Sequence, residues 1–360
     1  MKKFLAFVLL ITTLFTLAAC TPTAAPSTQA PAAEGNTTSE TTTKGCKVGI
    51  NNFGVANFFA RAGKAALEDE LKKLGCEVVA TVTADVSSRT AAIENMISQG
   101  VDAIIIEEGD VNEVAPALKE AKAAGIIIGS MDGGTADFID IYVSSDNNNL
   151  GTVVSEIMVE KIGGKGNIVE IINDAGSMIR ARKDAMHAVI ANYPDIKITD
   201  SLVYSWPDYY PDIKSKMESI LQANPNPGDI VAVFASFDGV GIAAADAIRE
   251  AGRQDEIVIV GIDGDPDAYA EMRKADSPFI ATMAQDPDTI ARETVRRVIA
   301  LLNGETFTDK VMYIPGILIT KDNVPVAEGD TASAETTELK APEGCKVGIN
   351  NFGVANFFAR

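Results

Sequence analysis

The chain has 360 residues, of which 46% are hydrophobic and 22% are charged, and its formal net charge is −19. This composition excludes a disordered or coiled-coil protein, and the length allows two domains of about 150 residues each. The excess of acidic side chains repels phosphate backbones and anionic lipid headgroups, so we expect no nucleic-acid partner.

The N-terminus is typical of a secreted protein. Residues 1–19 contain two lysines, an apolar run and small residues, which predicts a signal peptide. Leu17-Ala18-Ala19-Cys20 resembles the lipobox of bacterial lipoproteins, in which the cysteine becomes the lipidated first residue of the mature chain; the alternative is an ordinary signal followed by a cysteine. Residues 20–45 are rich in Thr, Ala and Pro and predict a disordered tether. We therefore expect an extracytoplasmic protein, anchored to the cell membrane only through its N-terminal lipid, with no membrane-spanning segment in the mature chain.

Residues 46–323 alternate short, apolar, β-branched segments with longer segments of helical periodicity. This alternation predicts an α/β protein with two doubly wound parallel-sheet lobes. Strands are predicted at 47–50, 77–82, 101–106, 126–129, 167–172, 197–203, 230–234 and 257–261. Helices are predicted at 58–74, 88–99, 111–124, 151–161, 177–192, 213–222 and 240–251.

The fourth strands of the two series end alike. Ile128-Gly129-Ser130-Met131-Asp132-Gly133 parallels Val260-Gly261-Ile262-Asp263-Gly264, so an Asp follows each strand. Ligands of open α/β sheets bind beyond the carboxyl ends of the strands, which makes Asp132 and Asp263 candidate ligand-binding residues on opposite sides of one cleft. The alternative is that each Asp only caps the helix that follows.

From Cys46 to Asn323 the chain resembles the type 1 periplasmic sugar-binding proteins, the ribose- and galactose-binding group that feeds ABC importers. The segments that carry the resemblance are Ala56-Asn57-Phe58-Phe59, Ser145-Asp146-Asn147 with Leu150-Gly151, Arg180-Ala181-Arg182, Ala232-Val233-Phe234-Ala235, residues 260–267 and Ala281-Thr282-Met283-Ala284-Gln285. The resemblance implies an N-terminal lobe of residues 46–145 and 286–314 and a C-terminal lobe of residues 146–285 and 315–323. Three hinge crossovers, near Ser144, Gln285 and Pro315, would join them.

Aromatic residues are candidates for the walls of a sugar site, because a sugar ring has an apolar face. Phe58 and Phe59 follow the first strand, where the family stacks a sugar; we favour Phe59 as the wall, and one of the two could instead belong to the core. Asn57 beside them could bind the ligand or cap the helix. Trp206, the only tryptophan, lies in a loop where galactose-binding relatives place a stacking aromatic, and Tyr209 is the substitute candidate.

Polar candidates and departures from the family follow from the same resemblance. Arg182 stands where family members use an Arg to grip sugar oxygens, although it could instead form a structural ion pair. Gln285 matches a family ligand contact or is a hinge residue. Ribose binders carry Arg where this chain has Gly133 and Asn where it has Phe237, which disfavours ribose itself and adds an aromatic residue. Glu107 and Glu108 add acidity and favour a neutral or cationic ligand, unless they form a solvated turn.

Several kinds of chemistry lack their residues. His187 is the only histidine, so neither a Ser-His-Asp triad nor a His-based metal cluster can form. Asp263, Asp265 and Asp267 mimic a calcium loop, but Asp265 before Pro266 is better explained as a helix N-cap. We expect no catalytic residue, no metal and no cofactor, and hence no enzyme.

The cysteines indicate a disulfide. Cys46 precedes the first strand and Cys76 the second, and neighbouring parallel strands lie about 4.8 Å apart, which places both at one edge within bridging distance. Free buried thiols are the alternative.

The C-terminus repeats the start of the folded region. Residues 344–360 are identical at all 17 positions to residues 45–61, after an acidic, Thr-rich linker at 324–343. A recent duplication, a truncated second domain of a tandem protein or an assembly artefact would explain the repeat, as would a deliberately made chain in which the second copy competes for the first strand's place. The linker resembles the tether before the first copy, which favours the truncated tandem protein. We hypothesise that the copy stays outside the fold.

These observations lead to one main interpretation. We expect a monomeric, lipid-anchored solute-binding protein that captures a neutral monosaccharide or small polyol and delivers it to an ABC permease. A ligand-sensing lobe that signals to a membrane receptor is the alternative. A transcription regulator of the same fold would need an N-terminal DNA-binding helix pair, where this chain has a signal peptide and a tether.

Overall fold

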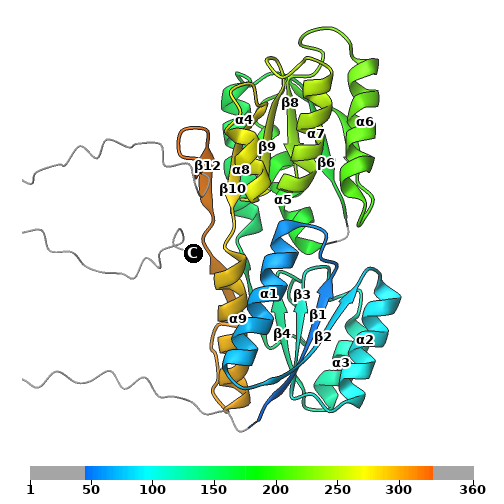
Figure 1. The fold of residues 1–360 in the computed structure, drawn as a ribbon, viewed down its shortest axis with the longest axis vertical. Helices are drawn as coiled ribbons and strands as arrows, with labels where there is room; N and C mark the ends of the chain where they lie inside the picture. Colours follow the sequence, from blue (N-terminus) through cyan, green and yellow to red (C-terminus); the bar gives the residue numbers. More distant parts are fainter. Residues whose placement is uncertain (1–44, 175, 327–360) are drawn as a thin grey trace, which may run out of the picture. The chain divides into compact units, whose positions relative to one another are not determined.

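A computed structural model describes residues 45–174 and 176–326 of the chain (Figure 1). The predicted signal peptide, Cys20 with its lipid, nearly all of the tether, most of the linker after residue 323 and the repeat at 344–360 lie outside the described residues.

The first lobe is built on a six-stranded parallel sheet. Its strand order is β11-β5-β4-β3-β1-β2, so a strand from near the end of the fold completes a sheet that begins at residue 47. The strands are β1 (Lys47–Phe53), β2 (Glu77–Thr83), β3 (Ala103–Glu107), β4 (Ile127–Met131), β5 (Ile141–Ser145) and β11 (Val311–Ile314).

The second lobe repeats this plan with one difference. Its strand order is β12-β10-β9-β8-β6-β7, and only the edge strand β12 runs antiparallel to its neighbour. The strands are β6 (Gly166–Ile172), β7 (Ile196–Val203), β8 (Ala232–Ala235), β9 (Val258–Asp263), β10 (Phe279–Ala284) and β12 (Ile317–Thr320). The two sheets confirm the predicted fold class of two doubly wound α/β lobes.

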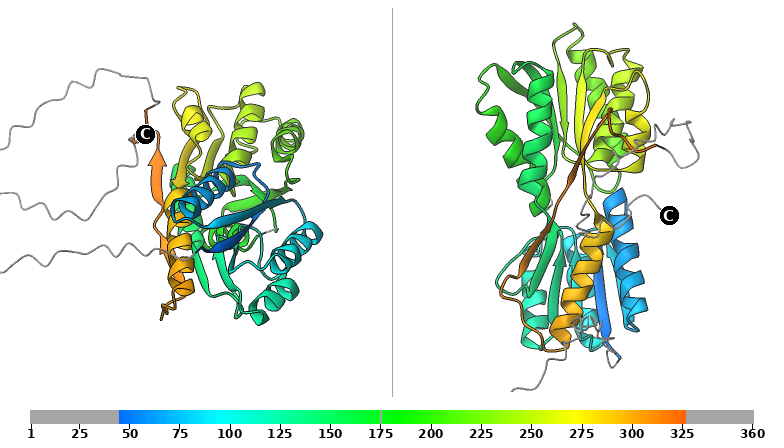
Figure 2. Two further views of the ribbon diagram at one scale, coloured as in Figure 1. Left: turned by 60° about the horizontal axis from the view of Figure 1, so that its bottom comes forward. Right: turned by 90° about the vertical axis from the view of Figure 1, so that its left-hand side faces the viewer.

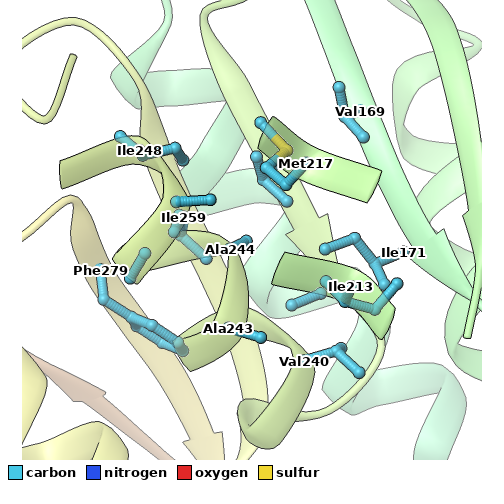
Figure 3. Packing of buried hydrophobic residues seen from close by; sticks show 14 of the residues in the cluster. Val169, Ile171, Ile213, Met217, Val240, Ala243, Ala244, Ile248, Ile259 and Phe279 are labelled. Atoms are coloured by element: carbon cyan, nitrogen blue, oxygen red, sulfur yellow. The ribbon is translucent and has the colours of Figure 1, made fainter. Parts of the chain in front are cut away.

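Helices cover both faces of each sheet and create four hydrophobic cores. On the first sheet, α1 (Phe58–Lys73) and α9 (Pro287–Leu302) pack on one face, and α2 (Val86–Ser98) and α3 (Ala115–Ala123) on the other. On the second, α4 (Asn147–Lys161) packs against β9 and β10 beside α5 (Ser177–Ile190). The opposite face carries α6 (Tyr209–Ala223), α7 (Asp238–Glu250) and α8 (Pro266–Met272). Figure 3 shows how side chains of α6 and α7 pack on those of β6, β9 and β10 in this core.

The chain passes between the two sheets three times. The crossings lie between β5 and α4, between β10 and α9, and between β11 and β12. The last crossing runs in a continuous extended course alongside the lobes (Figure 2, right). These short connections lie beside the region where the carboxyl ends of both sheets meet.

Several element boundaries differ from the predictions. Helix α3 begins at Ala115 instead of residue 111, because residues 111–114 form a turn before Pro116. Helix α4 begins at Asn147 instead of residue 151, because the Asp146 side chain caps it by accepting from the Asn149 amide at 3.1 Å. Helix α9 and strands β5, β10, β11 and β12 were not predicted.

A disulfide joins the starts of β1 and β2. Lys47 pairs with Glu77 across these parallel strands, so Cys46 and Cys76 lie side by side with their Cα atoms 4.6 Å apart. The Glu77 amide also donates to the Cys46 carbonyl at 2.8 Å.

Candidate functional site

A cavity lies where the carboxyl ends of the strands of both sheets meet. Residues from the loops after β1, β3, β6, β7, β8 and β9 line it, together with the first turn of α5, which is the position expected for a ligand site of open α/β sheets. The lining residues are Phe53, Asn57, Glu108, Gly109, Asn173, Gly176, Met178, Ile179, Arg182, Tyr204, Trp206, Phe237 and Asp263.

Three acidic residues at strand ends share an unusual backbone. Glu108 and Asp132 both have φ of 56°, and Asp263 has φ of 135°; within the described residues they are the only residues other than glycine with a positive φ. Such conformations cost about 1–3 kcal/mol each and persist where the surrounding structure enforces them, often at functional sites. Each follows or ends a parallel strand, and the unusual φ turns the chain where the strand stops. The strain thus marks the cavity region independently of its shape.

Arg182 is the centre of a buried polar network. It is 2% exposed, and its Nε donates to Asn147 Oδ1 at 2.7 Å. Its Nη1 donates to the Ser236 carbonyl at 2.9 Å and to Asp263 Oδ1 at 3.3 Å. The ion pair that sequence analysis gave as an alternative role for Arg182 is therefore present, and Arg182 also lines the cavity.

The same network links the two predicted aspartates. Asn147 Nδ2 donates to Asp132 Oδ1 at 3.2 Å, and the Ser144 hydroxyl donates to the same oxygen. Gln285 Nε2 donates to Asp263 Oδ1 at 2.9 Å. Asp132 and Gln285 thus lie behind the cavity surface, where they hold Asn147 and Asp263 in place.

Burial sets the charge state of the two aspartates. Desolvation raises the pKa of Asp263 to about 6, against the opposing effects of Arg182 and Gln285. Desolvation also raises the pKa of Asp132, although Arg182, Ser144 and Asn147 favour its charged form. Both carboxyl groups are acceptors for hydroxyl donors when they are ionised.

Aromatic side chains from the second lobe form one wall. Trp206 stacks on Tyr209 with ring centroids 5.9 Å apart and an interplanar angle of 18°. Tyr209 and Tyr204 both make edge-to-face contacts with Phe237, at 4.9 Å and 5.3 Å. Tyr209 therefore supports Trp206 from behind, and Trp206, Tyr204 and Phe237 face the cavity.

Gly54 of the first lobe lies directly against this aromatic wall. A Cβ atom at Gly54, where φ is 82°, would lie 2.7 Å from the Trp206 ring. The next residue along the cavity is Phe53, whose ring packs 4.9 Å from the Arg89 guanidinium. The Trp206 indole Nε1 is buried without a hydrogen-bond partner, so an unused donor lies at the cavity.

Helix α1 places the remaining predicted residues. Asn57 caps it, since its Oδ1 accepts from the Ala60 amide at 2.7 Å, and it also lines the cavity. Phe59 is 1% exposed in the core of the first lobe and does not line the cavity, so we do not retain it as the wall. Phe58, the first residue of the helix, does not line the cavity either.

Sequence reasoning missed several residues of the site. Asn147 was recognised only as part of a family segment, and Glu108 was recognised only as an acidic residue. Three further residues were not recognised at all: Tyr204, Phe53 and Met178. The signal for Asn147 was its place directly after an Asp that caps a helix at a crossover. The ends of β1, β3 and β7 would have indicated Phe53, Glu108 and Tyr204, whereas Met178 lies in the first turn of α5.

The described part of the chain contains neither a candidate metal-binding cluster nor a candidate membrane-spanning helix. Residues 45–174 and 176–326 contain no group of three His, Cys, Asp or Glu residues that could hold a metal ion. None of the helices in these ranges combines the length and the apolar character needed to cross a membrane.

Comparisons with known proteins identify the family. Residues 48–306 match the family described as "Periplasmic binding protein domain". The chain is 31% identical over 301 residues to the xylitol-binding protein of Mycolicibacterium smegmatis, covering 81% of this chain and 82% of that protein. It is 30% identical over 308 residues to the ribose import binding protein RbsB of Bacillus subtilis, covering 85% and 95%.

A solved structure agrees with these matches. An ABC transporter solute-binding protein from Agrobacterium vitis with bound allitol has a TM-score of 0.75 and 30% sequence identity, covering 78% of this chain and 97% of that one. The chain therefore belongs to the type 1 periplasmic sugar-binding family, as its sequence motifs predicted. Family members are binding proteins for ABC transporters and not enzymes, which also agrees with the prediction.

Proposed function

We propose that this protein is an extracytoplasmic lipoprotein that captures a neutral monosaccharide or small polyol between its lobes and delivers it to an ABC importer. The observation that carries the proposal is the composition of the cavity. Arg182, Asp263 and Asn57 offer hydrogen-bonding groups beside an aromatic wall. A polyhydroxylated solute with apolar ring or chain faces matches that combination.

The size of the cavity supports the same class of ligand. Its volume of about 60 Å³ restricts the ligand to a small solute. Relatives named for xylitol and ribose, and a neighbour with bound allitol, handle solutes of this kind.

Each group has a proposed task. Four side chains bind or position the ligand hydroxyls, directly or through Asn147: Asp132, Asp263, Arg182 and Gln285. Trp206 and Phe237 cover its apolar face, with Tyr209 behind them. Lipidation of Cys20 would keep the protein at the membrane, close to its permease.

Trp206 supplies the test of the ligand site. Titration with ribose, xylitol and allitol should change the intrinsic fluorescence of the only tryptophan and raise the melting temperature, and Asp263→Ala should abolish both effects. The exposed Asp276 gives a matched control, since Asp276→Ala should bind as the wild type does. An unaltered titration of Asp263→Ala would contradict the assignment of the ligand site.

The lipid anchor has its own test. Cys20→Ser should move the protein from the membrane fraction to the soluble fraction.

A further inference from the structure

Glu108 holds its carboxyl group at the cavity through a fixed backbone. Its amide donates to the Met131 carbonyl at 2.9 Å, and its own carbonyl accepts from Arg89 Nη2 at 3.0 Å. The residue is 9% exposed and has φ of 56°, a conformation that a glycine would adopt with less strain. A glutamate in this position indicates that its side chain is needed in the cavity.

The groups around this carboxyl are mostly acidic. Glu107 precedes it in the chain, and Asp132 and Asp263 face it from the ends of β4 and β9. Arg182, from α5, and Arg89, from α2, are the nearby cations, and the Tyr204 hydroxyl also interacts with it.

Neither cation is bonded to the Glu108 carboxyl. Arg182 donates to Asn147, to the Ser236 carbonyl and to Asp263. Arg89 donates to Asn51 and to the backbone carbonyl of Glu108. Within residues 45–174 and 176–326 no lysine or arginine forms an ion pair with this carboxyl, and its side-chain partner is the neutral amide of Asn57.

A carboxyl group in such surroundings keeps its proton. A buried carboxylate that faces two others and lacks a bonded cation is costly, and protonation removes that cost. Burial first, and then the charges of Asp132 and Asp263, raise the pKa of Glu108 to about 8. At neutral pH the group is therefore a carboxylic acid with an O–H donor, whereas an ionised carboxylate could only accept.

We propose, on the basis of the function proposed above, that Glu108 meets the ligand as a neutral carboxylic acid that donates its O–H to a ligand oxygen, and thereby selects uncharged polyols and sugars. Asp263, which is paired with Arg182, already repels acidic analogues. A protonated amine of a ligand next to Glu108 would favour the ionised carboxylate. Glu108 would then have no O–H to donate to the ligand. The residue is thus a specificity determinant for the uncharged state of the ligand.

The first test needs no ligand. Between about pH 4.5, where the unfolded carboxyl ionises, and about pH 8, the folded chain holds one proton more at this residue, so its stability falls with rising pH. Glu108→Gln keeps an N–H donor and does not titrate. We expect its melting temperature to exceed that of the wild type by a margin that widens from pH 4.5 to pH 8 and is constant above. The exposed Glu113 is the control, since Glu113→Gln should show no such trend. A margin for Glu108→Gln that does not change with pH overturns the inference.

The second test uses calorimetric titration with xylitol, ribose and allitol from pH 6 to pH 9.5. Wild-type affinity should fall about tenfold between pH 7 and pH 9, as the protonated fraction of a group with pKa 8 falls. Glu108→Gln should bind with little pH dependence, and Glu108→Ala about tenfold more weakly at pH 7.

The outcomes separate the two proposals. If 1-amino-1-deoxyxylitol binds the wild type more tightly than xylitol and its affinity rises with pH, Glu108 acts as a carboxylate and the inference is wrong while the binding function stands. Wild-type affinity for the neutral probes that is constant through pH 9 also overturns the inference alone. Failure of every neutral probe to bind at pH 6 overturns the proposed function, and this ligand assignment with it.

Discussion

Arg182 is the side chain on which the polar part of the cavity depends. It is nearly fully buried and is the cation nearest to Asp263, and it also fixes the amide of Asn147. Breaking a buried ion pair by removing one partner typically costs about 3–5 kcal/mol, because the other charge stays buried and uncompensated.

Arg182→Met should therefore lower the free energy of unfolding by about 3–5 kcal/mol in urea denaturation at pH 7. The double variant Arg182→Met/Asp263→Asn should recover most of that loss, since no unpaired charge remains, yet it should not bind sugars or polyols. Arg296→Met is the control: its ion pair with Glu293 lies on the surface, and its loss should cost at most about 1 kcal/mol. Equal stability of Arg182→Met and the wild type would contradict this role.

At the same scale, sequence reasoning found residues whose position follows from a strand end. Asp132 and Asp263 were indicated by the parallel between the two halves. Phe59 was misplaced, although Gly63, Ala66 and Leu67 share its buried stripe on α1, and this periodicity would have assigned it to the core. Glu108 was identified only as an acidic residue at a strand end, because nothing in a glutamate predicts a left-handed backbone.

Among the elements, β1 and β2 carry the one covalent cross-link of the described residues. The Cys46–Cys76 disulfide closes a segment of 30 residues that contains all of α1. Loop closure of this length removes enough entropy from the unfolded chain to stabilise the fold by about 3–4 kcal/mol.

Replacing both cysteines by serine should reduce the free energy of unfolding by about 3–4 kcal/mol, with the cavity intact because it lies at the opposite ends of these strands. Adding dithiothreitol to the wild type should give the same loss, while the variant should not respond to it. A wild type whose stability is unchanged after the thiols of both cysteines have been shown to be reduced would show that the cross-link contributes little.

The elements that sequence reasoning missed depend on distant partners. Strands β11 and β12 have four residues each, VMYI and ILIT, and their apolar, β-branched residues match the strand pattern. Their partners β5 and β10 come much earlier in the sequence, and the pattern alone does not indicate this pairing. Helix α9 did have local signals: Asp286 caps it and Pro287 begins it. Its place on the first sheet could be inferred only from the family resemblance.

For the whole molecule, an ion pair joins charges of the two lobes outside the cavity. The Arg180 guanidinium at the start of α5 forms an ion pair with Asp110 in the loop after β3. Asp110 is held by the Asn112 amide at 2.9 Å, so it presents a fixed carboxylate. This pair links the lobes without lining the cavity.

Arg180→Ala should speed ligand release about two- to fivefold, because a partly exposed ion pair contributes up to about 1 kcal/mol to the closed form. Stopped-flow measurement of Trp206 fluorescence would give the dissociation rate, and the difference from the wild type should shrink in high salt. Arg292, whose ion pairs stay within the first lobe, provides the control, and Arg292→Ala should leave the rate unchanged. An equal effect of both substitutions would exclude an interlobe role.

The three acids with left-handed backbones carry a cost that the fold bears even when no solute is bound. Glycine at any of these positions would relieve local strain. Substitutions selected only for heat resistance should therefore accumulate at Glu108 and not at Asp263, because loss of Asp263 would leave the buried Arg182 unpaired. Such a chain would gain stability by losing one of the groups through which we propose that it binds its ligand.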